Sequence, residues 1–111
     1  MQVAVIHTAF EEAPQTVAFV EVGDRTGDDA LEYAYRRTNN IGGSWSKGET
    51  IEWQGEIHEN PDYSEDVTVM APLPIHNGEE YGLRSTSVGD MMLLGTTKYR
   101  VAGFGFEEVT C

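Results

Sequence analysis

The stretch RSTSVGDMMLLGTTKYRVAGFGFEEV, Arg84–Val109, decides the fold that this sequence predicts. A polar, turn-forming entry over 85–90 leads into the continuous apolar run Met91–Leu94. A short connection over 95–97 leads to a second apolar run, Tyr99 to Phe106. Two apolar runs bounded by turn residues predict a β-hairpin. Four consecutive apolar residues are typical of a strand covered on both faces, so we expect this hairpin at the centre of the domain.

Two further strands are expected at the N-terminus, over Met1–Thr8 and Thr16–Val22. The second of these, TVAFVEV, is the better strand pattern. If the two strands pair in antiparallel fashion, the second should bury its face of Ala18, Val20 and Val22.

One helix is expected, over about 29–40. Asp29 is suited to cap its first turn, and Glu32 three residues later completes a capping-box pattern. Asn39–Asn40 and Gly42–Gly43 predict a left-handed stop at its C-terminus. The residues that fall on one stripe, and should face the sheet, are Ala30, Leu31, Ala34, Tyr35 and Thr38.

The middle of the chain predicts shorter strands. Residues 51–58 have apolar positions at period two and glycines that would weaken a helix, so we interpret them as one strand. Another strand is expected over 66–71, and Asn77–Gly78 predicts a tight turn. The sequence as a whole, 1–111, therefore predicts a single compact α+β domain. Its sheet should be mostly antiparallel, with five to seven strands and one helix packed on one face.

The net charge of −12, from 19 acidic and 7 basic residues, restricts the possible partners. Direct binding to nucleic acid is not expected, because the phosphate backbone would be repelled. The charge favours solubility and attraction to basic protein surfaces. The cysteine at 111 is the only one, which excludes an internal disulfide and fits a reducing cytoplasm. No apolar stretch is long enough for a membrane span, and the N-terminus does not have the pattern of a signal peptide.

The polar turn Ser85–Asp90 and the segment Tyr99–Val109 (YRVAGFGFEEV) together resemble the conserved end of the YodL-like domains. They are also similar to the end of many small proteins carried by phages and plasmids. A weaker echo lies in Thr38–Ile41 followed by Trp45. The resemblance covers roughly the last quarter of the chain. It implies an origin in a mobile genetic element and supplies no catalytic residues.

An acidic belt stands out between Gly48 and Leu83, where the sequence has no Lys or Arg. One interpretation is an anionic face that imitates nucleic-acid phosphates and docks on a basic groove, which requires its carboxylates to share one side of the sheet. The other is a solvated, solubilising surface. The candidate partner-binding acids are Glu49, Glu52, Glu56, Glu59, Asp62, Glu65, Asp66, Glu79 and Glu80.

Trp45 is a further candidate for partner binding. It lies in the glycine-containing segment 41–47, near Arg36, Arg37 and Lys47, and Trp and Arg dominate the energetics of many interfaces. The alternative is a Trp that folds back onto the core.

Catalytic, metal and cofactor sites are not expected. The three histidines, His7, His58 and His76, lack the spacing that places two ligands on one face. Ser85, Ser87 and Asp90 contain no nucleophile elbow, and turn formation explains them without chemistry. The glycines of Gly103–Phe106 lack the lysine of a phosphate-binding loop, and core packing or a bulge explains them better.

These observations lead to one main hypothesis about function. It is a non-enzymatic, acidic accessory protein of a phage or plasmid that acts in the host cytoplasm by occupying a basic surface of a host protein. Its sharpest version is a nucleic-acid mimic that inhibits a defence system, of the anti-CRISPR or anti-restriction type. The first alternative is a small interaction module that homodimerises through a sheet edge, and the second is a small hydrolase.

Overall fold

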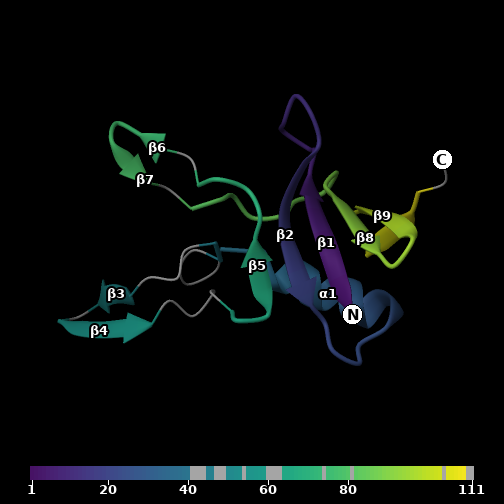
Figure 1. Ribbon diagram of the computed structural model, residues 1–111, viewed down its shortest axis with the longest axis horizontal. Helices are drawn as coiled ribbons and strands as arrows, with labels where there is room; N and C mark the ends of the chain where they lie inside the picture. The colour runs from purple at the N-terminus through teal and green to yellow at the C-terminus, as the bar shows by residue number, and fades with distance from the viewer. Residues whose placement is uncertain are drawn as a thin grey trace.

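The computed structural model describes residues 1–40, 45–46, 50–53, 55–59, 64–73, 75–80, 82–103 and 105–109. These residues form one six-stranded antiparallel sheet, one α-helix and two separate two-stranded sheets (Figure 1). The predicted α+β class, with one helix and a mostly antiparallel sheet of five to seven strands, is confirmed.

The six-stranded sheet has the strand order β10-β9-β8-β1-β2-β5. The central pair is formed by strands that are far apart in the sequence, because residues 3–6 pair with residues 91–94. The predicted hairpin of β8 and β9 therefore does contribute a central strand. The strands are β1 (Gln2–His7), β2 (Gln15–Glu21), β5 (Val67–Val69), β8 (Met91–Leu94), β9 (Thr97–Val101) and β10 (Phe106–Glu108).

The core lies mainly on β1, β2 and the helix. The predicted antiparallel pairing of the first two strands is confirmed, and Ala18, Val20 and Val22 are buried as expected. A register shift leaves Val17 as an extra residue in β2, and it is buried too. In β8 only Met92 is fully buried, so this strand is covered less completely than its apolar run predicts.

The helix α1 (Gly27–Arg37) packs against β1 and β2 and lies behind the sheet in the view of Figure 1. It begins two residues before the predicted start. Thr26 occupies the N-cap position without a side-chain hydrogen bond, so the predicted capping box of Asp29 and Glu32 is wrong. Gly27, with φ of +55°, lets the chain enter the helix from a left-handed conformation.

The helix ends in a different way from the predicted left-handed stop. The Thr38 hydroxyl donates to the Ala34 carbonyl at 2.8 Å, and the Asn39 amide donates to the Tyr35 carbonyl. Side chains therefore satisfy the last carbonyls, and neither Asn39 nor Asn40 has a positive φ. Gly42–Gly43, the other part of that prediction, lies outside the described residues.

Residues 51–58 form two strands and not the predicted single strand. β3 (Thr50–Trp53) and β4 (Glu56–Glu59) pair in antiparallel fashion, and Gly55 in their connection has a φ of +78°. A second small hairpin joins β6 (Ile75–His76) to β7 (Glu79–Glu80). Its turn is the predicted Asn77–Gly78, with both φ angles positive, as a type I′ turn requires. Both hairpins project away from the β5 edge of the main sheet (Figure 1).

The glycine-rich end of the chain is a turn and not the continuation of a strand. The predicted run from Tyr99 to Phe106 is divided: β9 ends at Val101, and β10 begins at Phe106. The Ala102 amide donates to the Gly105 carbonyl at 3.0 Å, and Gly105 has a φ of +68°. The two glycines of this segment thus form a tight connection between β9 and β10, which places their turn opposite α1.

Among the described residues, no helix is long and apolar enough to cross a membrane.

Candidate functional site

Two groups of carboxylates distinguish this molecule, and the first is organised around Asp90. Asp90 lies just before β8 and is fully buried. Its Oδ1 accepts hydrogen bonds from the backbone amides of Thr8 and Ala9, both at 2.9 Å, and its Oδ2 accepts one from the Ser87 amide at 2.8 Å. The predicted role of Asp90 and Ser87 as organisers of the turn is confirmed, and the same carboxylate also fixes the end of β1.

Arg84 supplies the charge that lets Asp90 be buried. Its guanidinium donates to both oxygens of Asp90 at 2.7 Å and to both oxygens of Glu11, at 2.7 and 3.1 Å. The same guanidinium lies 4.9 Å from the centre of the Phe10 ring. This double fork joins the β1–β2 loop to the segment that enters β8. We call Arg84, Asp90 and Glu11 the arginine node.

The ionisation of the node follows from its contacts. Burial alone would raise the pKa of Asp90, but the Arg84 guanidinium and the three backbone amides outweigh it and lower the pKa to about 2. The hydrogen bond from Arg84 lowers the pKa of Glu11, and the hydrogen bond to Asp90 raises the pKa of Arg84. Burial lowers the pKa of His7, whose Nε2 lies 4.0 Å from Asp90 Oδ2.

A buried chain of hydroxyls continues from the node to the helix. The Thr38 hydroxyl uses its hydrogen on the Ala34 carbonyl, so the 2.7 Å contact between Thr86 and Thr38 has Thr86 as donor. His7 Nε2, 3.0 Å from the Thr86 hydroxyl oxygen, then donates its N–H to that oxygen, and burial favours the neutral ring because it lowers the pKa of His7. The order is His7 to Thr86 to Thr38 to the helix end. Every hydroxyl proton is in use, and all three side chains are buried.

Trp45 belongs to this buried framework. It is fully buried, its indole N–H donates to the Arg84 carbonyl at 2.8 Å, and its ring meets His7 edge-on at 6.3 Å between centroids. Of the two interpretations of Trp45, the structure therefore shows the core residue and not the interface residue. Asn40 completes the connection, because it bonds the Trp45 amide, the Leu83 carbonyl and the Ser85 hydroxyl.

The node and its hydroxyl chain are a structural framework. The serine hydroxyls that were candidate nucleophiles are bonded to backbone groups: Ser85 accepts from Asn40, and Ser87 donates to the Ser85 carbonyl. Neither serine is bonded to His7. Among the described residues, no group of three or more His, Cys, Asp or Glu side chains could hold a metal ion.

The acidic belt of residues 48–83 is distributed over several elements. Among the described residues, β5 is the only strand of this belt that joins the six-stranded sheet, so the prediction of one shared sheet is wrong for β3, β4, β6 and β7. Glu65 and Asp66 are exposed just before β5, and Asp66 accepts a hydrogen bond from the Tyr33 hydroxyl. Glu52, Glu56 and Glu59 lie on β3 and β4, and Glu79 and Glu80 form β7. Glu49 and Asp62 lie outside the described residues.

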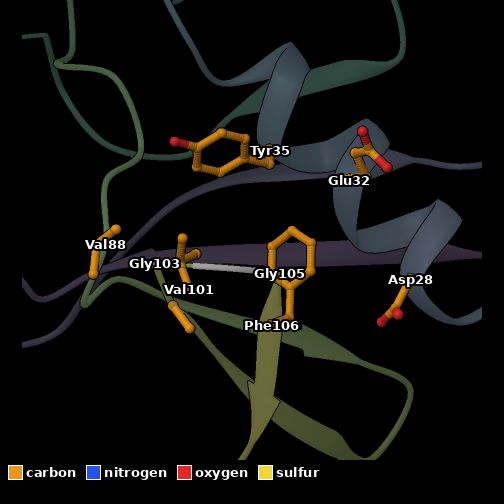
Figure 2. A pocket seen from close by; sticks show the side chains of 9 residues that line it. Asp28, Glu32, Tyr35, Val88, Val101, Gly103, Gly105 and Phe106 are labelled. Carbon is orange, nitrogen blue, oxygen red and sulfur yellow. The ribbon is translucent and has the colours of Figure 1, made fainter.

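The second group of carboxylates lines a cleft between α1 and the β9–β10 turn, with a volume of about 410 Å³ (Figure 2). Asp28 and Glu32 stand one helical turn apart on α1, and both are exposed. Neither forms an ion pair or hydrogen bond with another described residue. We call this the α1 cleft. Its lining consists of Asp28, Glu32, Tyr35, Val88, Val101, Ala102, Gly103, Gly105 and Phe106.

Aromatic and apolar groups complete the α1 cleft. The rings of Tyr35 and Phe106 meet edge-on, with 6.3 Å between centroids and 75° between planes. Figure 2 shows the Phe106 ring reaching up from β10 toward the helix, between the carboxylates and Val88. None of the described lining residues is basic. The cleft thus combines two exposed anions with two partly buried rings.

Sequence reasoning missed both the arginine node and the α1 cleft. A signal for the cleft was present: Asp28, Glu32 and Tyr35 have the spacing i, i+4, i+7 of one helix face. Glu32 was interpreted only as part of a capping box and Tyr35 only as a residue that faces the sheet. The opposite wall could not be recognised, since the GFGF segment was interpreted as a strand. For the node, the signal was a lone Arg84 directly after a long stretch without basic residues.

Comparison with known proteins found no family model, curated protein or solved structure that matches this chain.

Proposed function

We propose that this protein is a non-enzymatic binder that occupies a basic surface of another protein. The observation that supports this most directly is a set of exposed carboxylates that have no ion pair or hydrogen bond with any described residue. They belong to a chain with a net charge of −12. These carboxylates are Glu12, Asp24, Asp28, Asp29, Glu32, Glu65 and Glu108.

The physical argument concerns where the few cations are used. Arg84 is engaged by Asp90 and Glu11, Arg100 by Glu107, and Arg25 and Arg37 lie over the ring of Tyr33. The described cations without an ion pair are Arg25, Arg36, Arg37 and Lys98, against seven exposed carboxylates without one, so the charge available to a partner is negative on balance. Such a surface attracts basic proteins and speeds their encounter.

The sharpest form of the proposal is an accessory protein of a phage or plasmid that mimics nucleic acid and inhibits a host defence system. The resemblance of Ser85–Asp90 and Tyr99–Val109 to proteins of mobile elements supports this form. So does the placing of acidic strands in the β3–β4 and β6–β7 hairpins, which project from one edge of the sheet (Figure 1). A host protein that binds nucleic acid would offer the matching basic groove.

The two alternatives receive less support. A dimer through paired sheet edges would use β5 or β10, but each has three residues, and β10 includes the exposed Glu107 and Glu108. Short, charged edges resist edge-to-edge pairing. A hydrolase would need an accessible nucleophile, and the hydroxyls nearest His7 are buried and fully bonded.

The proposal is tested with the protein immobilised and exposed to host lysate at about 50 mM and about 200 mM salt. We expect a basic, nucleic-acid-binding protein to be retained at low salt and released at high salt. The retained protein is then purified and tested for competition between this chain and a DNA or RNA duplex. Failure to retain any basic protein at low salt, or binding that is indifferent to the duplex, would contradict the nucleic-acid mimic.

A further inference from the structure

We infer that the α1 cleft is the binding site for one arginine side chain of the basic partner. This inference rests on the proposed function and makes it specific: it names the place on the surface and the chemical group that is bound. The observation behind it is the combination, in one cleft, of two exposed carboxylates without a cation and two aromatic rings.

The charge of the cleft calls for a cation. Asp28 and Glu32 lie one turn apart on the helix, so their carboxylates can reach a single group between them. Arg36 lies one further turn along and forms no ion pair with a described residue, although it lines a second depression, beside Tyr33, which Glu32 lines as well. No basic residue of the described chain therefore occupies the cleft.

The aromatic rings and the apolar lining of the cleft favour a cation that is planar or has an apolar stem. Tyr35 and Phe106 are partly buried and leave surface in the cleft, and Val101 and Val88 extend the apolar wall. A guanidinium stacks on aromatic surface and loses less hydration than an ammonium group does. Its five N–H donors form a planar fork, which can serve two carboxylates at the same time. These properties favour arginine over lysine.

The size of the cleft is consistent with one long side chain. Its volume of about 410 Å³ lies near the lower end of the range for small-ligand sites, about 300–1,000 Å³. Such a space is too small for a partner helix, and it is open at the surface. A side chain that projects from a docked protein can therefore enter it, and arginine is one of the residue types enriched at interface hot spots.

The test is an NMR titration of the isotope-labelled protein with N-acetyl-L-arginine methylamide, which presents the side chain without free termini. We expect saturable amide shifts at Asp28, Glu32 and the 101–106 turn, with a dissociation constant in the millimolar range. The matched neutral probe is the N-acetyl-citrulline methylamide, which has nearly the same shape and no charge. We expect it to bind at least fivefold more weakly.

Two variants keep the inference falsifiable. The double variant Asp28→Asn/Glu32→Gln should weaken arginine binding at least fivefold, whereas Glu21→Gln/Glu107→Gln, with the same loss of charge at two exposed acids outside the cleft lining, should change it less than twofold. Gly103→Leu should also weaken binding, because the new side chain starts in the cleft lining. A Cβ at Gly103 meets nothing within 4 Å and its φ is not left-handed, so the fold should tolerate it.

Several outcomes would overturn the inference. They are the absence of saturable shifts at the cleft, equal binding of the citrulline probe, and equal loss in both double variants. Tighter binding of agmatine than of the acetylated arginine would indicate a free amine ligand and not a protein side chain. The failure of the cleft assignment can be distinguished from the failure of the proposed function. If a basic partner is retained equally by wild type and by Asp28→Asn/Glu32→Gln, the cleft assignment is wrong and the proposed function stands.

Discussion

The arginine node and the α1 cleft both contain exceptional carboxylates, but the two sites differ in what their charges meet. At the node, Asp90 is buried and accepts five hydrogen bonds, two of them from Arg84. At the cleft, Asp28 and Glu32 are exposed and have no partner among the described residues. A carboxylate whose bonds are all made within the chain holds the fold together. One that has none is available to a ligand.

The comparison also separates two uses of glycine. Gly89 lies in the node segment with a φ of +98°, and an added Cβ would stand 3.3 Å from the Cβ of Ala9. Gly103 lies in the cleft lining, where an added Cβ would meet nothing. Neighbouring atoms therefore leave little room for a side chain at Gly89, whereas a side chain at Gly103 would extend into solvent. Each difference predicts a measurable contrast.

The largest expected effect is on stability at the node. Asp90→Asn leaves Arg84 without its buried counter-charge and cannot satisfy all five donors, so we expect a loss of about 3 kcal/mol or more in the free energy of unfolding. Urea denaturation measures it. Asp28→Asn is the matched change at the cleft and should stay within about 0.5 kcal/mol. Equal losses for the two variants would remove the distinction between the sites.

A smaller effect is expected from acid. The folded pKa of Asp90, about 2, lies below its ordinary value of 3.8, so its stabilisation is complete above about pH 4 and is lost as the pH falls through about 2. The difference corresponds to about 2.5 kcal/mol. His7 adds an earlier loss, because below about pH 6.5 the unfolded chain takes up a proton that the buried neutral ring does not.

Unfolding measured in urea between pH 7 and pH 2 checks both effects. Replacement of His7 by Gln should remove the loss that begins near pH 6.5 and leave the loss below pH 4 in place. A stability profile that stays flat down to pH 3 in the wild type and in this variant would contradict the role given to both groups.

The smallest contrast concerns the two glycines. Gly89→Ala forces a side chain into a left-handed conformation and against Ala9, which should cost about 1–2 kcal/mol. Gly103→Ala should change stability by less than about 0.5 kcal/mol. Thermal denaturation of the two variants side by side measures the difference. A larger loss at Gly103 than at Gly89 would mean that the cleft lining is part of the framework.

Much of the fold could be predicted from the sequence, because local patterns determine it. The alternation in Thr16–Val22, the Asn77–Gly78 turn and the apolar stripe of the helix each specify their element within a few residues. The boundaries at Tyr99–Phe106 failed because apolar residues on both sides of a glycine turn look like one strand. The capping box failed because a pattern of residue types does not fix which residue starts the helix.

The sites were harder to predict, since they depend on contacts between distant segments. Asp90 meets Thr8 and Ala9 across more than 80 residues of sequence, and Asp28 faces a turn that follows Val101. No local pattern encodes those approaches. Trp45 shows the same limit, because its position near basic residues suggested an interface, whereas the backbone of Arg84 holds its indole in the core.

The central claim is that the exposed carboxylates of the α1 cleft recognise arginine, whereas the buried ones maintain the fold. The most direct measurement is isothermal titration calorimetry of an arginine-rich peptide, at about 50 mM salt, against wild type, Asp28→Asn/Glu32→Gln and Glu21→Gln/Glu107→Gln. We predict about a tenfold loss of affinity for the cleft variant, or about 1.4 kcal/mol, and less than a twofold loss for the control. Equal affinities of the two variants for the peptide would contradict it.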